Sequence, residues 1–260
     1  MNAKTPVWID VIILSYAKTD ALKLMTEQSI QSLIDSEDAS EVSFNIIVIE
    51  SNHDLKPYQY PNTNTVYSDK KFGYHKYMNT GINMSENPYV CICNNDLLFH
   101  PKWATEILKA FDQDSSIQSA SPLCSIHHPL ITGIEPNSGV YIGYEVRREI
   151  TGWCLFFKRS ILKKTGLLDE KFTFWYADND YANTLKKHSI NHALVTSSIV
   201  DHLESKTLKT FNQEEQLKMT AMERFYFEYK WEGRSYFSYL NRLLKSKKEI
   251  NRQIKKTGDS

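Results

Sequence analysis

The chain has 260 residues, of which 41% are hydrophobic and 24% are charged, and its formal net charge is zero. This length suits one large domain, or one domain with a small appendage, and the composition is typical of a globular protein. No apolar run approaches the ~20 residues that span a bilayer, and the N-terminus lacks the apolar core of a signal peptide. We therefore expect a protein of the cytoplasm, or of the host cytoplasm if the protein is viral.

The four cysteines, Cys91, Cys93, Cys124 and Cys154, do not have the spacing of a metal site. Because cysteine is among the most readily buried residue types, we expect four buried free thiols.

The charge is unevenly distributed. Residues 234–260 hold eight Lys or Arg against two acidic residues, so the rest of the chain carries a compensating negative surplus. This basic tail is compatible with a polyanionic partner, and a solvated terminal helix is the alternative.

In the first 113 residues, apolar runs of strand length alternate with amphipathic segments. A buried strand is predicted at 9–14, and Thr19 or Asp20 can cap the helix that follows. The remaining predicted elements of this half are strands at 44–49, 65–67 and 89–93, a polar loop at 53–64, a helix at 74–84, and a helix opened by Pro101. This alternation predicts a mainly parallel sheet with right-handed crossovers in an α/β sandwich.

The second half is less regular. Strands are predicted at 117–123, 139–148, 153–157 and 190–200, with a helix at 180–188. Residues 213–231 are helical in pattern but aromatic on several faces, which indicates packing on more than one side.

Two acidic segments are the strongest chemical signals. Asn94-Asn95-Asp96 follows an apolar strand, and an acid at the carboxyl end of such a strand is well placed to hold a metal or a ligand. About eighty residues later, Asp178 and Asp180 lie among aromatic residues, where a carboxylate is a candidate general base. Together they predict metal-assisted group transfer.

The order of the motifs resembles a family 2 glycosyltransferase of the GT-A fold, in its rhamnosyltransferase-like branch, from about residue 9 to residue 206. Asn94-Asn95-Asp96 resembles the Asn-Asn-Asp form of that family's metal-binding DxD motif. The other matching segments are 72–82 (FGYHKYMNTGI), 152–159 (GWCLFFKR), 166–172 (GLLDEKF) and 175–181 (WYADNDY). The sequence departs from the family where Ala177 replaces a Glu and where Lys71 replaces an Asn.

The resemblance implies a GT-A type α/β/α sandwich with a C-terminal helical extension. Its expected parts are a nucleotide-binding half at 1–113, an acceptor half at 114–206, and an extension with the basic tail at 207–260. The implied activity is inverting transfer of a sugar from a nucleotide-diphosphate donor to an acceptor hydroxyl.

The resemblance also suggests roles for individual residues. Asp96 and His202 are the candidate ligands of Mn²⁺ or Mg²⁺, and Asp178, with Asp180 as runner-up, is the candidate base. The candidate donor-binding residues are Ser15, Tyr16, Glu50, Asn52, Lys71, Asn79, Asn94 and Asn95. The candidate acceptor-binding residues are Trp153, Trp175 and Tyr176.

The sequence leaves several alternatives open. The donor is expected to be UDP- or dTDP-linked, and the acceptor is a saccharide or, as in some related viral enzymes, a hydroxymethylated base in DNA; the oligomeric state is undetermined. A catalytically inactive protein that binds carbohydrate or nucleic acid is the rival from another class. A sugar nucleotidyltransferase is disfavoured because residues 14–20 hold no glycine for a triphosphate-binding loop.

Overall fold

The computed structural model describes residues 5–203 and 213–246, and for 213–221 it describes the backbone alone. The expected domain boundary at residue 206 and the basic tail beyond residue 246 lie outside the described residues. The division into domains therefore stays a prediction.

The N-terminal half is a parallel α/β unit. Its elements are β1 (Val7–Ser15), α1 (Asp20–Asp35), β2 (Val42–Glu50), the 3₁₀ turn η1 (His53–Leu55), β3 (Asn64–Tyr67), α2 (Tyr74–Ile82) and β4 (Tyr89–Cys93). Strand β1 lies between β2 and β4, parallel to both. The Thr19 hydroxyl accepts a hydrogen bond from the Leu22 amide and caps α1, as predicted.

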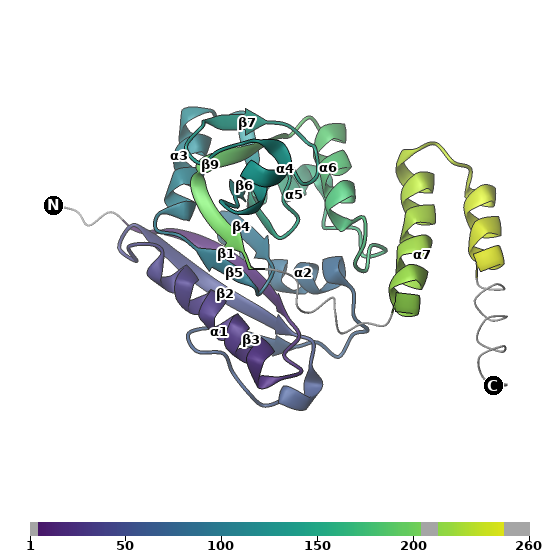
Figure 1. The fold of residues 1–260 in the computed structure, drawn as a ribbon, viewed down its shortest axis with the longest axis horizontal. Coiled ribbons are helices and arrows are strands. Elements are labelled where there is room, and N and C mark those ends of the chain that lie inside the picture. Colours follow the sequence, from purple (N-terminus) through teal and green to yellow (C-terminus); the bar gives the residue numbers. More distant parts are fainter. Residues whose placement is uncertain (1–4, 204–212, 247–260) are drawn as a thin grey trace.

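The second half extends the same sheet. Its elements are β5 (Leu97–Phe99), α3 (Trp103–Gln113), β6 (Ile117–Leu123), α4 (His127–Thr132), β7 (Val140–Ile142), β8 (Cys154–Lys158), η2 (Arg159–Ile161), α5 (Leu162–Thr165), α6 (Ala177–Lys187), β9 (Asn191–His202) and α7 (Gln213–Trp231). The strand order is β3-β2-β1-β4-β8-β6-β9-β5, with β7 paired to β9 (Figure 1). Strands β5, β7 and β8 run antiparallel to their neighbours. The predicted α/β sandwich with a mainly parallel sheet is confirmed.

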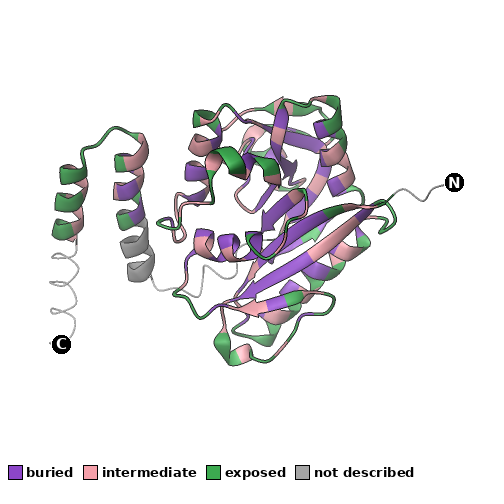
Figure 2. Cartoon of the chain, turned by 180° about the vertical axis from the view of Figure 1, so that it is seen from behind, coloured by how far each residue is buried: buried purple, intermediate pink, exposed green. Residues whose placement is uncertain are grey.

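The core explains why the strands are so apolar. The central strands are buried along their length (Figure 2), and the sheet separates two apolar clusters. Ile9, Val11 and Ile13 of β1 belong to one cluster and Ile12 to the other, so alternate side chains of one strand serve both faces. All four cysteines are buried free thiols, as predicted.

Three local expectations differ from the structure. Only Val140–Ile142 of the strand expected at 139–148 is extended, because a tight turn bridged between Val146 and Ile150 replaces the rest. The short strand β5 and the short helices α4 and α5 were not expected. Pro101 also lies before α3 rather than in its first turn, since Lys102 takes a left-handed conformation (φ 66°) as the N-cap.

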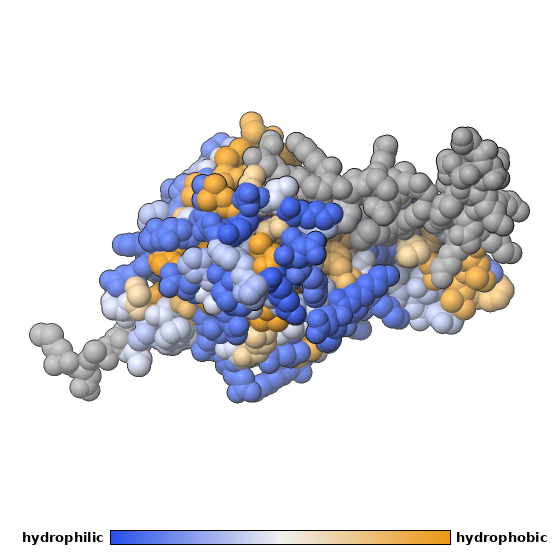
Figure 3. Space-filling model, turned by 90° about the horizontal axis from the view of Figure 1, so that it is seen from below, coloured by the Kyte–Doolittle hydropathy of each residue, from blue (hydrophilic) through white to orange (hydrophobic). Residues whose placement is uncertain are grey.

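The C-terminal helices form a hairpin beside the α/β unit (Figure 1). Helix α7 is followed by a helix over 236–246, where the described residues end. Apolar side chains gather over this end of the molecule (Figure 3), and Phe237 and Leu244 are among the exposed ones. Within the described residues, no helix is long and apolar enough to cross a bilayer.

Candidate active site

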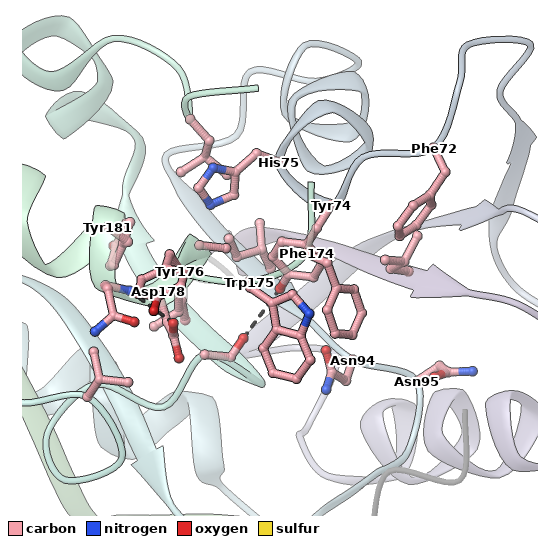
Figure 4. A pocket seen from close by; sticks show the side chains of 18 of the residues that line it. Phe72, Tyr74, His75, Asn94, Asn95, Phe174, Trp175, Tyr176, Asp178 and Tyr181 are labelled. Atoms are coloured by element: carbon pink, nitrogen blue, oxygen red, sulfur yellow. Dashed lines mark hydrogen bonds between the residues drawn. The ribbon is translucent and has the colours of Figure 1, made fainter. Parts of the chain in front are cut away.

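A cavity of about 830 Å³ opens where β1 and β4 end and α6 begins. Ser15 and Tyr16 reach it from the end of β1, residues 94–96 from the end of β4, and Trp175 to Asp178 from the segment that leads into α6. In Figure 4 the indole of Trp175 stands between the Asp178 carboxylate and the amide of Asn94. The two acidic segments singled out in the sequence therefore face one cavity.

Asp96 and His202 are brought together by strand pairing. Residue 96 precedes β5 and residue 202 ends β9, and the antiparallel register of these strands places Leu97 opposite His202. The Asp96 Oδ1 and His202 Nε2 atoms lie 3.2 Å apart, with 5% and 15% of the respective side chains exposed. Both atoms are buried and neither has a hydrogen-bond partner.

This pair fits a divalent cation. Buried polar atoms are normally hydrogen-bonded, so two facing atoms that both lack such a bond indicate a missing partner that binds both. A carboxylate oxygen with an imidazole nitrogen suits Mn²⁺, whereas Mg²⁺ favours oxygen alone. Within the described part of the chain no cluster of three or more His, Cys, Asp or Glu is found, so ligands from outside the chain would have to complete the coordination.

Asp178 lies in the first turn of α6, where it lines the cavity and is half-buried. Burial raises the pKa of Asp178 above its ordinary value, while the backbone amide of Asn179, which donates to Oδ1 at 2.9 Å, and the charge of Arg147 act to lower it. A Cβ atom at Gly152 would lie 2.9 Å from the Asp178 Cβ and 3.0 Å from its Oδ2. Because Gly152 has no side chain, the Asp178 carboxylate has room to lie against it.

Asp180 is placed differently from Asp178. It is 3% exposed and does not line the cavity. Its Oδ1 accepts a hydrogen bond from Trp231 Nε1 at 2.7 Å and lies 2.7 Å from Lys230 Nζ. Lys230 also bonds Asp169 at 2.8 Å, so helix α7 ties the 166–172 segment to the 175–181 segment. The geometry makes Asp180 an anchor for α6.

The candidate donor residues divide into two groups. Ser15, Tyr16, Asn94 and Asn95 line the cavity, whereas Glu50, Asn52, Lys71 and Asn79 do not. The Glu50 carboxylate is fully buried and accepts from the Ser15 hydroxyl (2.7 Å), the Tyr60 hydroxyl (2.9 Å) and the backbone amides of Ala17 (3.1 Å) and Asn52 (2.7 Å). Glu50 therefore fixes the conformation of the loop after β1 through buried hydrogen bonds.

The other three lie outside the cavity for separate reasons. Asn52 caps η1 and donates to the Ala17 carbonyl at 2.7 Å. Asn79 donates to the Leu168 carbonyl at 2.8 Å and accepts from its amide at 3.0 Å, which joins α2 to the 166–172 segment. Lys71 is exposed.

Of the candidate acceptor residues, Trp175 and Tyr176 line the cavity. Tyr176 has a left-handed backbone (φ 58°) as the N-cap of α6, and this turn sets Asp178 at the cavity wall. Trp153 does not line the cavity; its ring stacks on His202 at 5.8 Å with an interplanar angle of 10°. Trp153 is therefore placed to orient the His202 imidazole.

A comparison with known families bears on this site. Residues 10–129 match the family model for glycosyl transferase family 2. The match covers a little under half of the chain, and it runs from within β1 to beyond β6 and includes Asn94, Asn95 and Asp96. It supports a family 2 glycosyltransferase, whereas the rhamnosyltransferase-like branch remains a prediction. A search among curated proteins found no match to the chain.

Sequence reasoning missed several residues that shape the site. Arg147 lines the cavity, and Lys230 and Trp231 of α7 hold Asp169 and Asp180. Gly152 is the first residue of the 152–159 segment, but the sequence did not predict that it packs against Asp178. These contacts join residues that are 26 to 61 positions apart, and no local pattern records such contacts.

Proposed function

We propose that this protein is an inverting, metal-dependent glycosyltransferase that moves a sugar from a nucleotide-diphosphate donor to an acceptor hydroxyl. The observation that carries the proposal is the single cavity lined by both Asp96 and the half-buried Asp178, with the buried His202 Nε2 3.2 Å behind the Asp96 carboxylate and outside the cavity lining. The family 2 match over residues 10–129 supports the same conclusion.

Donor recognition is assigned to the side of the cavity formed by β1 and β4. The Tyr16 ring offers a stacking surface for the nucleotide base, which we expect to be uracil or thymine. Asn94 and Asn95 form the loop that brings Asp96 to the cavity, and the Asn95 amide is fixed by a 2.8 Å hydrogen bond to the Thr26 hydroxyl. Glu50, Asn52 and Asn79 would act through the loops that they hold.

The reaction requires removal of a proton from the attacking hydroxyl. Asp178 would accept this proton through its carboxylate while the hydroxyl attacks the anomeric carbon from the face opposite the diphosphate, which inverts the configuration. Trp175 and Tyr176 would bind the acceptor on the same side as Asp178. When bound by Asp96 and His202, Mn²⁺ or Mg²⁺ supplies a Lewis acid that neutralises charge on the leaving diphosphate.

The test separates donor binding from transfer. A panel of nucleotide sugars with Mn²⁺ is scored for release of free nucleotide, and binding of the nucleotide diphosphate is measured by calorimetry. Asp96→Ala should abolish metal-dependent donor binding, because it removes the carboxylate ligand. Asp178→Asn should keep donor binding and lose transfer, by roughly 10²-fold or more for the loss of a positioned base.

Asp112→Asn is the matched control, since this exposed aspartate on α3 does not line the cavity. Normal transfer by both Asp96→Ala and Asp178→Asn would refute the proposal. Donor binding without any turnover in the wild-type protein would instead favour the inactive, carbohydrate- or nucleic-acid-binding alternative.

The acceptor remains assigned to two classes, a saccharide or a hydroxymethylated base in DNA. The DNA class was motivated by the basic tail, of which Lys247, Lys248, Arg252, Lys255 and Lys256 lie outside the described residues. Binding of duplex DNA at low salt that disappears on deletion of 247–260 would favour this class.

A further inference from the structure

One cationic side chain at the cavity is assigned neither to the donor, nor to the metal, nor to proton transfer. Among the described residues that line the cavity, Arg147 is the only arginine or lysine. Its side chain is exposed, and the described residues offer it no ion-pair partner, whereas the neighbouring Arg148 is paired with Glu149. His75 also lines the cavity, but burial lowers its pKa, so it adds no charge at neutral pH.

The backbone at Arg147 is held in an uncommon conformation. Its φ of 71° lies in the left-handed region, which non-glycine residues rarely adopt. The Arg147 amide donates to the Ile150 carbonyl at 2.8 Å, and the amides of Arg148, Glu149 and Ile150 all donate to the Glu145 carbonyl. A strained position that its surroundings fix in this way is typical of functional sites.

The turn at 145–150 is anchored from below by buried groups. The Glu149 side chain is buried and accepts from the Glu145 amide at 3.1 Å. The Glu149 carbonyl lies 3.0 Å from His192 Nε2 and the Arg148 carbonyl lies 3.2 Å from His128 Nε2. Gly143 gives the Glu149 carboxylate its space, because a Cβ there would lie 2.4 Å from Glu149 Cδ. The guanidinium of Arg147 thus projects from a rigid support.

The position of Arg147 separates it from the donor. The turn lies between β7 and β8 in the acceptor half, a few residues before Gly152, which packs against Asp178. Arg147 is also near enough to Asp178 for its charge to act on that carboxylate. The donor residues come instead from the ends of β1 and β4.

We infer that Arg147 binds a negatively charged group of the acceptor, a phosphate or a carboxylate, next to the hydroxyl that Asp178 deprotonates. The inference rests on the proposed function and narrows its substrate class to anionic acceptors. A guanidinium matches the geometry of either anion through paired N–H donors. A charge-assisted contact of this kind favours the anionic acceptor over its neutral analogue by about tenfold or more.

The experiment uses pairs of probes that differ in charge. With UDP and Mn²⁺ at saturation, quenching of tryptophan fluorescence, to which Trp175 of the cavity contributes, reports the dissociation constants of glucose 6-phosphate, glucuronate and glucose. We expect the wild type to bind at least one charged probe about tenfold more tightly than glucose. Arg147→Gln should abolish this preference, Arg147→Lys should retain part of it, and UDP affinity should stay unchanged in both.

Lys164→Gln serves as the matched control, because this exposed lysine on α5 does not line the cavity. Equal binding of charged and neutral probes by the wild type would overturn the inference, as would an unchanged preference in Arg147→Gln. Loss of UDP affinity in Arg147→Gln would overturn it too, by placing Arg147 at the donor. Failure of the wild type to bind either UDP or dTDP with Mn²⁺ would count against the proposed function itself.

Discussion

Replacing Gly152 by alanine tests whether the position of Asp178 controls catalysis. The added Cβ would lie 2.9 Å from the Asp178 Cβ, whereas carbon atoms in favourable contact are about 3.5–4.0 Å apart. Asp178 must therefore move by roughly 0.6 Å or more, because its Cβ is fixed to the backbone of α6 and cannot rotate away. The φ of Gly152 is not in the left-handed region, so alanine adds no backbone strain.

A displacement of about 1 Å at a reacting group can lower a rate by about 10²-fold, equivalent to roughly 2.7 kcal/mol of transition-state free energy. We expect Gly152→Ala to lower kcat by about this factor. Donor binding should be retained, since the added Cβ meets atoms of Asp178 and none of Asp96 or His202. Steady-state transfer rates and calorimetric binding of the nucleotide diphosphate measure the two effects.

Gly73→Ala is the matched control. A Cβ there would meet its nearest neighbour, Lys76 Cβ, at 3.5 Å, an ordinary contact, and Gly73 does not line the cavity. Full activity of Gly152→Ala, or equal losses in Gly152→Ala and Gly73→Ala, would refute the reasoning that Gly152 sets the position of the base.

Three further predictions concern stability and reactivity. Because burial raises the pKa of Asp178, the folded protein holds the carboxyl proton more tightly than the unfolded chain does. The folded state therefore loses stability as the pH rises through the folded-state pKa. Asp178→Asn removes this loss, so it should raise the melting temperature at neutral pH and weaken the gain in stability on acidification. An unchanged or lower melting temperature would contradict this. Lys230→Met should lower the free energy of unfolding, measured by urea titration, by about 3 kcal/mol, because it leaves Asp180 buried without its cation. The control Lys186→Met replaces an exposed lysine of α6 and should leave the free energy of unfolding nearly unchanged. All four buried thiols should resist alkylation in the native state and react on unfolding, and rapid native labelling of any of them would show the packing to be different.

The sequence by itself determined the alternating strands and helices of the first half. Hydrophobic runs and caps are local signals, so β4 was predicted at its observed bounds and the cap of α1 was narrowed to Thr19 or Asp20, of which Thr19 is the cap. The order of motifs likewise pointed to Asp96 and Asp178 as residues of one site. The prediction of a strand over 139–148 was wrong, because the turn at 145–150 is held by Glu149, His128 and His192, which come from separate segments.

Only the tertiary structure decided how the acidic residues differ. Asp178 and Asp180 are two positions apart and equivalent in sequence, yet the helical turn directs one to the cavity and the other to Lys230 and Trp231 of α7. Pairing of β5 with β9 brought Asp96 to His202 across 106 residues, and the turn before β8 brought Arg147 to Asp178. Such contacts arise from packing between distant segments, and a local sequence pattern carries no record of them.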